Sequence, residues 1–326
     1  MNGVDVRSPL LYTVVGGVLA LISTVVFGSG AETAGRSPAV AAPAPPAAGP
    51  VSPGPPCVTV RDSLRPTGPL PVPGAMPAGS TMAAIAARGR LIVGVDQSKY
   101  LAGFRNPTTG DLDGSDIELT RRIAAALLGD PTKVQFVALS AADRVGVLTR
   151  SQVDLVVDTF TVTCGRQRDV EFSSDYMLAA QRLLVPSGVP AREVEDLAGQ
   201  RVCTSRGSTT EAVLRALPLH LDVVTLPAVP DCVVRLQRGQ VAAVSSDDVI
   251  LAGLAAQDPT LRVVGRPLDR ARYAIGVNRR SPDLVRFVNG VLEQARADGG
   301  LTASYRRWYA GALNPVPTPP PARYRD

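Results

Sequence analysis

The sequence predicts an α/β fold in the middle of the chain. Between residues 82 and 312, short apolar runs typical of buried parallel strands alternate with segments whose apolar residues recur at helical spacing. The full chain of 326 residues is long enough for two domains with a sizeable core. No internal repeat is visible, and the segments on either side of this region differ from it in composition.

The expected elements follow one another as strand and helix. The first strand is expected at 90–95 (RLIVGV), a short apolar run, and the first helix at 116–128 (DIELTRRIAAALL), where apolar positions repeat at helical spacing. The same two patterns predict the remaining elements. Strands are expected at 134–138, 153–157, 183–185, 201–203, 242–244, 261–264 and 274–277, and helices at 141–149, from Thr209 onward, and at 250–256, 282–297 and 301–309.

The N-terminus carries an uncharged run of eighteen residues, Leu10 to Phe27, at the lower edge of what spans a bilayer. We interpret residues 1–30 as a signal peptide or an uncleaved signal-anchor and favour the anchor, with cleavage after the small residues 28–31 as the alternative. The next cysteine is Cys57, too far away for acylation at the usual lipoprotein position. We therefore expect an exported chain, tethered by this segment to the extracytoplasmic face of the cell membrane.

Two proline-rich segments flank the predicted domain. Residues 37–78 hold thirteen of the 29 prolines, and this composition favours extended polyproline geometry over a packed core. We expect residues 31–80 to form a linker that acts as a stalk. Residues 313–326 are expected to be a proline-rich, disordered tail.

Composition and charge exclude several classes of function. The net charge of +5 is scattered and aromatic residues make up only 4% of the chain, which gives no support to nucleic-acid binding. His220 is the only histidine, which disfavours Ser-His-Asp and Cys-His catalysis. Four dispersed cysteines form no zinc-binding cluster. Hydrolases and metalloenzymes are therefore disfavoured. We expect a protein that is not an enzyme and has neither a metal nor a cofactor.

An ordered series of short motifs resembles the polar amino-acid-binding proteins of bacterial ABC transporters, the extracellular solute-binding proteins of family 3. Each motif alone is weak, but their common order is specific, and the resemblance covers residues 82–312. Within the family the chain is most similar to the glutamine-binding type. The motifs are LIVGVD (91–96), GSDIEL (114–119), SQVDLV (151–156), TVTCGR (161–166), VEFSSDY (170–176), DLAG (196–199), RGST (206–209), AAVSSD (242–247), and Gly299-Gly300 followed by YRRW (305–308).

The resemblance implies a two-lobed type II periplasmic-binding-protein clamp, in which each lobe is a mainly parallel sheet flanked by helices. Lobe 1 would comprise residues 81–182 and 272–312, lobe 2 residues 183–271, and two crossovers near 181–184 and 270–274 would form the hinge. The implied ligand is a polar L-amino acid: glutamate, aspartate, glutamine or asparagine. A monomer is expected, with the permease of an ABC importer or the extracellular domain of a membrane sensor as its partner.

Two residues match the family's recognition of the amino-acid backbone. Arg166, together with Thr161, matches the clamp for the α-carboxylate, which a planar guanidinium can meet with two parallel hydrogen bonds. A solvated arginine after a strand is the alternative interpretation. Asp247 matches the acceptor of the α-ammonium, although it could instead cap the next helix, a role also open to Asp248. Asp96, after the first strand, corresponds to another ammonium-side position.

Lys99 departs from the family pattern. It occupies a position where relatives often have an aromatic residue, and it either meets a distal carboxylate of the ligand or is an ordinary surface lysine. Asp158, directly after a predicted strand, would repel an acidic ligand unless it pairs with Lys99. The neighbouring Thr159 is also expected to line the site.

Residues at the start of a lobe 2 helix complete the candidate set. Free backbone amides and hydroxyl groups at a helix N-terminus favour an anion, so Ser208 and Thr209 are candidate ligand contacts. Arg206 is a further candidate, although the alternation of the strand before it can turn its side chain outward.

Disulfides are the default for four cysteines in an exported chain. The lobes implied by the resemblance place Cys203 and Cys232 together in lobe 2, and we expect them to pair. Cys57 would then pair with Cys164.

Two other functions are compatible with the same fold. A cyclic-acid dehydratase would need a general acid or base, and Asp158 or Asp96 could serve. A pure interaction module would have lost ligand binding altogether. Transport and sensing are not distinguished, because both use the same closure of the lobes.

Overall fold

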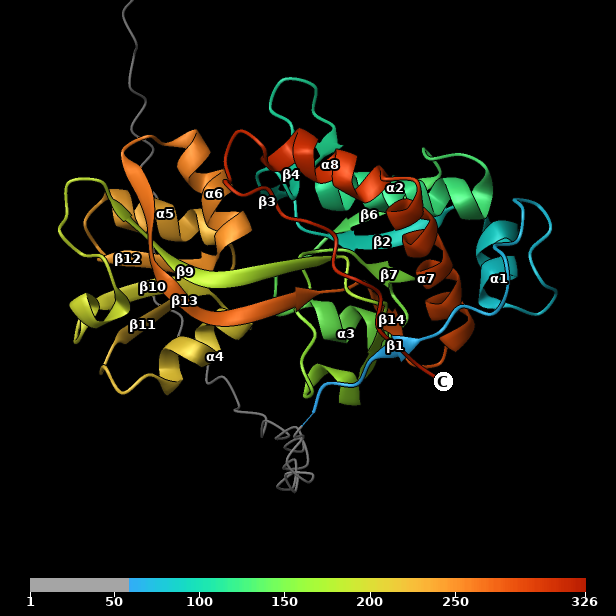
Figure 1. The fold of residues 1–326 in the computed structure, drawn as a ribbon, viewed down its shortest axis with the longest axis horizontal. Helices are drawn as coiled ribbons and strands as arrows, with labels where there is room; N and C mark the ends of the chain where they lie inside the picture. Colours follow the sequence, from blue (N-terminus) through green and yellow to red (C-terminus); the bar gives the residue numbers. More distant parts are fainter. Residues whose placement is uncertain (1–58) are drawn as a thin grey trace, which may run out of the picture. The chain divides into compact units, whose positions relative to one another are not determined.

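The computed structural model describes residues 59–326. The expected membrane segment, residues 31–58 of the expected linker and Cys57 lie outside the described residues. The described chain is α/β and has two five-stranded sheets, each flanked by helices (Figure 1). No helix within residues 59–326 is long and apolar enough to cross a membrane.

The first sheet has the strand order β6-β2-β7-β14-β8 and forms lobe 1. Strands β6, β2 and β7 are parallel, whereas β14 is antiparallel to both β7 and β8. Leu91, Val93 and Val95 of β2 are buried in the core. The strands are β2 (Leu91–Val95), β6 (Val134–Ala138), β7 (Leu155–Val156), β8 (Val170–Phe172) and β14 (Gly276–Asn278); the helices are α1 (Thr81–Arg88), α2 (Ser115–Leu128), α3 (Arg144–Thr149), α7 (Pro282–Ala297) and α8 (Gly300–Tyr309).

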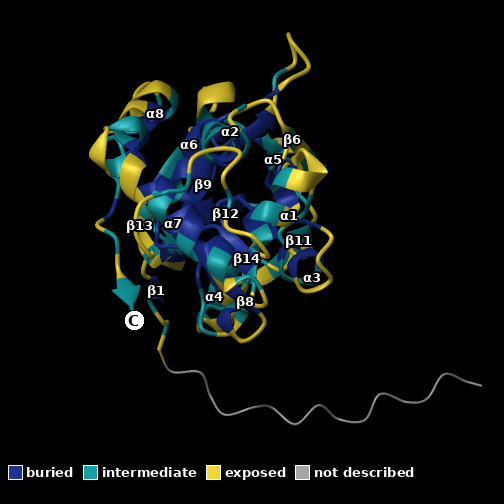
Figure 2. Ribbon diagram, turned by 90° about the vertical axis from the view of Figure 1, so that its right-hand side faces the viewer, coloured by how far each residue is buried: buried dark blue, intermediate teal, exposed yellow. Residues whose placement is uncertain are grey.

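The second sheet has the order β11-β10-β12-β9-β13 and forms lobe 2. Strand β10 is parallel to β11 and β12, and β9 runs antiparallel to β12 and β13. In Figure 2, β9 and β12 are buried at the centre and exposed residues lie on the outer helices and turns. The strands are β9 (Met177–Pro186), β10 (Arg201–Ser205), β11 (Asp222–Leu226), β12 (Ala243–Asp247) and β13 (Leu261–Tyr273); the helices are α4 (Thr209–Ala216), α5 (Val229–Gln237) and α6 (Asp248–Gln257).

Strands β9 and β13 run side by side from one sheet to the other (Figure 1). They pair from Leu261 and Pro186 at one end to Tyr273 and Met177 at the other, with an irregularity between Val264 and Asp269. Tyr273 also forms an antiparallel bridge with Thr161 of lobe 1. We propose that this two-stranded ribbon is the hinge.

Most predicted elements are confirmed, with differences in length. The expected strands at 183–185 and 261–264 are only parts of β9 and β13, because pairing along the ribbon extends both strands into sequence without apolar runs. The helix expected at 141–149 begins at Arg144. Residues 166–168 and 194–197 form short 3-10 helices. The prediction missed α1, β11, α5, the strand β8 and a small sheet of β3 (Ser98–Lys99), β4 (Gly103–Arg105) and β5 (Leu112–Asp113).

The expected stalk is wrong for its described part. Within residues 59–80, β1 (Ser63–Leu64) is buried, and Asn289 of α7 donates hydrogen bonds to Ser63 Oγ at 2.7 Å and to the Leu64 carbonyl at 2.6 Å. Leu70 packs where Gly290 of α7 leaves room, since a Cβ there would lie 2.8 Å from Leu70. Hydrogen bonds from Asn289 and the packing of Leu70 therefore hold this segment against α7.

The expected disordered tail is also wrong. Strand β15 (Tyr324–Arg325) pairs in parallel with β1, and Arg325 Nη2 lies 3.0 Å from Glu171 Oε2. Arg296 of α7 donates a hydrogen bond to the carbonyl of Pro320 at 3.0 Å. Backbone pairing and arginine hydrogen bonds therefore order a segment that has little apolar sequence.

The disulfide between Cys203 and Cys232 is confirmed, with a Cα–Cα distance of 5.5 Å and a sequence separation of 29 residues. It joins β10 to α5 within lobe 2. Closing a loop of this length stabilises the fold by about 3–4 kcal/mol on the chain-entropy model. The second expected pairing, between Cys57 and Cys164, involves a residue outside the described part of the chain.

Candidate functional site

Buried polar side chains gather where two parallel strands of lobe 1 end. Asp96 follows β2, and Asp158 follows the neighbouring strand β7, so their side chains meet at the same edge of the sheet. Lys99 reaches them from β3, and Arg144 from the start of α3. We call Asp96, Lys99, Arg144, Asp158 and Thr159 the polar cluster.

Lys99 is the centre of the polar cluster. Its ammonium contacts the Asp158 carboxylate, lies 3.3 Å from Asp96 Oδ2 and donates a hydrogen bond to Thr159 Oγ1 at 2.9 Å. Burial opposes its charge, but Asp158 and Asp96 outweigh burial and raise the pKa of Lys99 above its ordinary value. Because the residue is only 6% exposed, the surface-lysine interpretation is wrong.

Asp158 keeps one unused acceptor. Its Oδ1 contacts Lys99, whereas Oδ2 is buried without a hydrogen-bond partner within the described residues and lies 3.7 Å from Arg144 Nε. Arg144 Nε donates instead to the Ala141 carbonyl at 3.0 Å, and Nη1 donates to the Asp158 carbonyl at 3.0 Å. A buried oxygen of this kind favours a ligand group that donates a hydrogen bond.

Thr159 is held in an unusual backbone conformation. Its φ is 41°, in a region that β-branched residues rarely adopt. Its N–H donates to Asp116 Oδ2 at 2.7 Å, and the Tyr176 hydroxyl donates to the other oxygen of Asp116 at 2.9 Å. Burial raises the pKa of Asp116 to about 7 despite the bond from Thr159. Asp116 therefore holds the backbone of Thr159 in place and does not itself line the site.

Arg166 contacts both lobes. It donates hydrogen bonds from Nη1 to the Thr161 carbonyl at 2.7 Å and from Nη2 to the Gly207 carbonyl of lobe 2 at 3.3 Å. Its guanidinium lies 5.0 Å from the centroid of the Phe160 ring, and that of Arg144 lies 4.7 Å from the same centroid. The solvated-arginine alternative does not fit these contacts.

The charge of Arg166 is not balanced by a direct partner. Among the described residues it has hydrogen bonds to carbonyls and a ring contact, but no carboxylate at ion-pair distance. Burial, with the like charge of Arg144, lowers the pKa of Arg166 to about 9. Binding a carboxylate would relieve this penalty and supply two charge-assisted hydrogen bonds.

Asp247 faces the polar cluster from lobe 2. It ends β12 at the N-cap position of α6, but its side chain makes no capping bond; Oδ2 instead accepts a hydrogen bond from the Tyr273 hydroxyl at 2.5 Å. Asp248 binds the backbone N–H groups of Ala180 and Val249. Burial raises the pKa of Asp247 to about 6, although Tyr273, Lys99 and Arg144 favour its charged form.

The start of α4 contributes less than expected. Ser208 caps the helix by accepting a hydrogen bond from the Glu211 N–H at 3.1 Å, and it donates to the Ser205 carbonyl at 2.6 Å. Thr209 is half-buried, whereas the side chain of Arg206 is exposed and makes no described contact with the polar cluster. The structure thus leaves Ser208 in a capping role, turns Arg206 outward and shows no contact of Thr209 with the polar cluster. It brings seven sequence-predicted residues to one region: Asp96, Lys99, Asp158, Thr159, Thr161, Arg166 and Asp247.

Sequence reasoning missed four residues of this region: Arg144, Phe160, Asp116 and Tyr273. Asp116 lies inside a motif that we quoted, but nothing in the motif shows that its carboxylate binds the Thr159 backbone. Arg144 and Phe160 are ordinary residues for a helix and a strand end, so only their packing reveals them. Within residues 59–326, no group of three or more His, Cys, Asp or Glu side chains could hold a metal ion.

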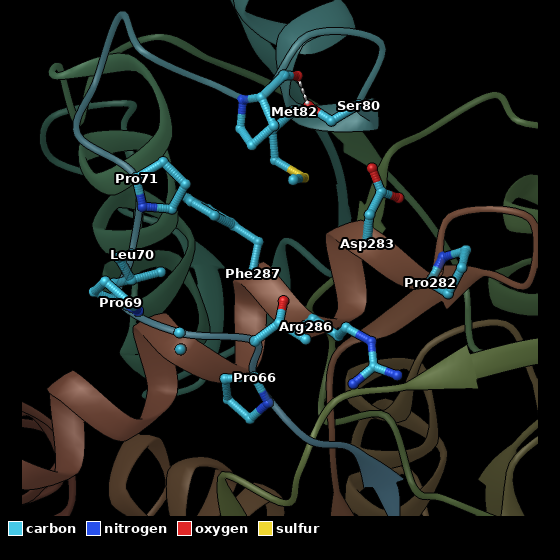
Figure 3. A pocket seen from close by; sticks show the side chains of 14 residues that line it. Pro66, Pro69, Leu70, Pro71, Ser80, Met82, Pro282, Asp283, Arg286 and Phe287 are labelled. Atoms are coloured by element: carbon cyan, nitrogen blue, oxygen red, sulfur yellow. Dashed lines mark hydrogen bonds between the residues drawn. The ribbon is translucent and has the colours of Figure 1, made fainter. Parts of the chain in front are cut away.

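A separate surface pocket of about 500 Å³ lies between residues 66–80 and α7 (Figure 3). Leu70, Met82 and Phe287 line it, and the carboxylate of Asp283 at its edge is bound by the N–H and hydroxyl of Thr81. This pocket shares no residue with the polar cluster.

Comparison with known proteins identifies the family. Residues 91–311 match the model of the bacterial extracellular solute-binding proteins, family 3. The chain belongs to this family. The motif resemblance and the two-lobed type II periplasmic-binding-protein fold that it implied are therefore confirmed. Members of the family are extracytoplasmic solute-binding proteins.

Individual relatives agree with this assignment. The chain is 31% identical to an ABC transporter glutamine-binding protein from Bacillus subtilis (strain 168), over 70% of this chain and 84% of the relative. It is 33% identical to a glutamine-binding protein from Geobacillus stearothermophilus, over 60% of this chain and 76% of the relative. The solute receptor for L-cysteine of Neisseria gonorrhoeae has a similar structure, with a TM-score of 0.68 and 28% identity, over 72% of this family member and 95% of the receptor.

Proposed function

We propose that the chain binds a polar L-amino acid between its lobes, on the extracytoplasmic face of a membrane to which its N-terminal segment tethers it. The ligand class is glutamine, asparagine, glutamate or aspartate. Closure of the lobes would present a surface to the permease of an ABC importer or to the extracellular domain of a sensor. The chain would act as a monomer without catalysing a reaction.

One observation carries the proposal: the guanidinium of Arg166 spans the two lobes without a carboxylate partner among the described residues. The α-carboxylate of an amino acid supplies that partner. The buried Asp158 Oδ2 and the carboxylate of Asp247 then offer acceptors for the α-ammonium. A zwitterion therefore matches the site at both of its charged ends.

The ion pairs of Lys99 bear on the ligand side chain. Its ammonium is neutralised by Asp158 and Asp96, so it offers little free charge to a distal carboxylate. We therefore expect the amides glutamine and asparagine to bind more tightly than glutamate and aspartate.

The test is thermal unfolding of the full chain, in mild detergent, with each proteinogenic amino acid in turn. A ligand at a thousandfold excess over its dissociation constant stabilises the folded state by about 4 kcal/mol, which raises the midpoint by several degrees. We expect the midpoint to rise with one or more of the four polar amino acids. If no amino acid raises it, the proposal fails, and an interaction module or a different ligand class becomes the better interpretation.

Binding is expected to weaken in acid. Since the pKa of Asp247 is about 6, lowering the pH below that value protonates the carboxylate that we assign to the ammonium. Affinity should then fall by up to about tenfold per pH unit below 6, as expected for one proton linked to binding. Isothermal titration between about pH 8 and pH 5 measures this. Asp247→Asn should bind the amino acid weakly at every pH and lose this pH dependence. If its affinity varies with pH as that of the parent does, Asp247 does not bind the ligand ammonium.

A further inference from the structure

Gly253 occupies an unfavourable position in α6. It lies in the interior of a buried helix whose neighbouring residues, Ala252 and Leu254, are good helix formers. Glycine destabilises a helix interior relative to alanine, because it loses more backbone freedom on folding. A glycine here therefore needs a reason outside the helix.

The reason is a close contact with the other lobe. A Cβ on Gly253 would lie 2.3 Å from the carbonyl oxygen of Tyr100, about 1 Å nearer than carbon and oxygen normally approach. Tyr100 belongs to the turn between β3 and β4 of lobe 1 and directly follows Lys99. The next residue, Leu101, holds a φ of 74°, which turns the chain at this contact. Bare helix backbone thus lies against the turn that carries the central lysine of the polar cluster.

A second glycine makes a similar contact between the lobes. Gly207, in the loop before α4, has a φ of 72°, and a Cβ there would lie 2.9 Å from both Cα and Cβ of Ala142 in lobe 1. Ala142 is two residues before Arg144, and the Gly207 carbonyl accepts the hydrogen bond from Arg166. Both glycine contacts are therefore next to side chains of the site.

We infer that Gly253 and Gly207 are positioning residues that set how closely the two lobes approach. Because they have no side chains, they let the β3–β4 turn after Lys99 and the guanidinium of Arg166 come into contact with lobe 2. A single methyl group at residue 253 should hold the lobes about 1 Å further apart. The inference rests on the proposed closure of the lobes but not on the identity of the ligand.

Gly253 is the better test position because alanine suits its helical backbone. Gly253→Ala should leave the midpoint of thermal unfolding unchanged or raise it. Gly207 would combine a steric change with strain, since its φ is positive. Gly188→Ala is the matched control, because a Cβ at Gly188 meets nothing within 4 Å.

The distance between the lobes can be measured without knowing the ligand. Nitroxide labels on Lys133→Cys in lobe 1 and Arg238→Cys in lobe 2, both exposed positions, report the distribution of distances by double electron–electron resonance in the full chain. We expect Gly253→Ala, and more strongly Gly253→Val, to lose the shortest distances that the parent and Gly188→Ala populate. Identical distributions in all four proteins, with and without amino acids, would overturn the inference.

Affinity provides the second measurement. For an amino acid that stabilises the parent chain, we expect Gly253→Ala to raise the dissociation constant at least tenfold and Gly188→Ala to leave it unchanged. Equal affinities in the two variants would also overturn the inference. If no amino acid stabilises the parent chain, the proposed function fails by that result, and the distance distributions alone decide whether Gly253 controls closure.

Discussion

Replacing Arg166 with alanine is expected to abolish amino-acid binding, with the dissociation constant rising by at least about a hundredfold. The loss removes two charge-assisted hydrogen bonds to the ligand carboxylate, each worth about 1.5–3 kcal/mol. It also removes the side chain that donates to Gly207 across the lobes. Isothermal titration with the amino acid that most stabilises the parent chain measures the effect.

Two further variants separate charge from geometry. Arg166→Lys keeps the charge but cannot form two parallel bonds, so we expect intermediate affinity. Arg206→Ala removes an exposed arginine one residue from Gly207 and should leave affinity unchanged. If Arg166→Ala binds the amino acid as tightly as the parent, another group binds the ligand carboxylate and the role assigned to Arg166 is wrong.

The sequence predicted the elements whose own pattern is strong. Strand β2 (Leu91–Val95) and helices α2 and α7 were found close to their observed bounds, because apolar periodicity alone specifies them. Strand β13 was found only in part, since its second half, ending at Tyr273, is charged and is a strand only because it pairs with β9. Such pairing depends on residues about ninety positions away and leaves no local pattern.

The proline-rich segments show the same limit. Proline content favoured extended geometry over a packed core, and it said nothing about docking on lobe 1. Ser63 and Leu64 are held by Asn289, a buried polar residue in the middle of α7, and Leu70 fits beside Gly290. Neither residue of α7 marks a docking site by its type, so the contact appears only in three dimensions.

The sequence predicted most of the residues that gather at the site, but not which of them form hydrogen bonds and ion pairs with one another. Parallel strands bring Asp96 and Asp158 together at one edge, which follows from the order of the elements. Whether Lys99 meets them or points to solvent depends on the β3–β4 turn, whose backbone is set by Leu101 at positive φ. The ion pair that neutralises Asp158 therefore remained one of two open interpretations.

Replacing Lys99 with methionine is expected to produce the largest loss of stability of any single substitution proposed for this chain. Methionine fills a similar volume but leaves the buried carboxylate of Asp158 without its nearest cation. Breaking a buried ion pair in this way lowers the free energy of unfolding by about 3 kcal/mol, near the low end of the usual range because Arg144 still lies 3.7 Å away. Chemical denaturation of the full chain measures the change.

The controls for Lys99→Met test whether the loss comes from the unpaired charge. Lys133, the only other lysine, is exposed, so Lys133→Met should change stability little. The double variant Lys99→Met/Asp158→Asn should recover much of the loss, since it removes the unpaired carboxylate. An equal loss in the single and double variants would show that packing, not charge, makes Lys99 important.

The pH dependence of Lys99→Met has a definite sign. Burial already raises the pKa of Asp158 above its ordinary value despite the nearby charges of Lys99 and Arg144, and loss of the lysine should raise it further. The folded state then binds the proton more tightly than the unfolded state, so the Asp158 contribution to stability increases as the pH falls through the folded pKa. The difference in unfolding free energy between the parent and Lys99→Met should therefore be smaller near pH 5 than near pH 8. A difference that does not shrink in acid would mean that the pKa of Asp158 does not rise when Lys99 is lost, and that Arg144 alone keeps this carboxylate charged.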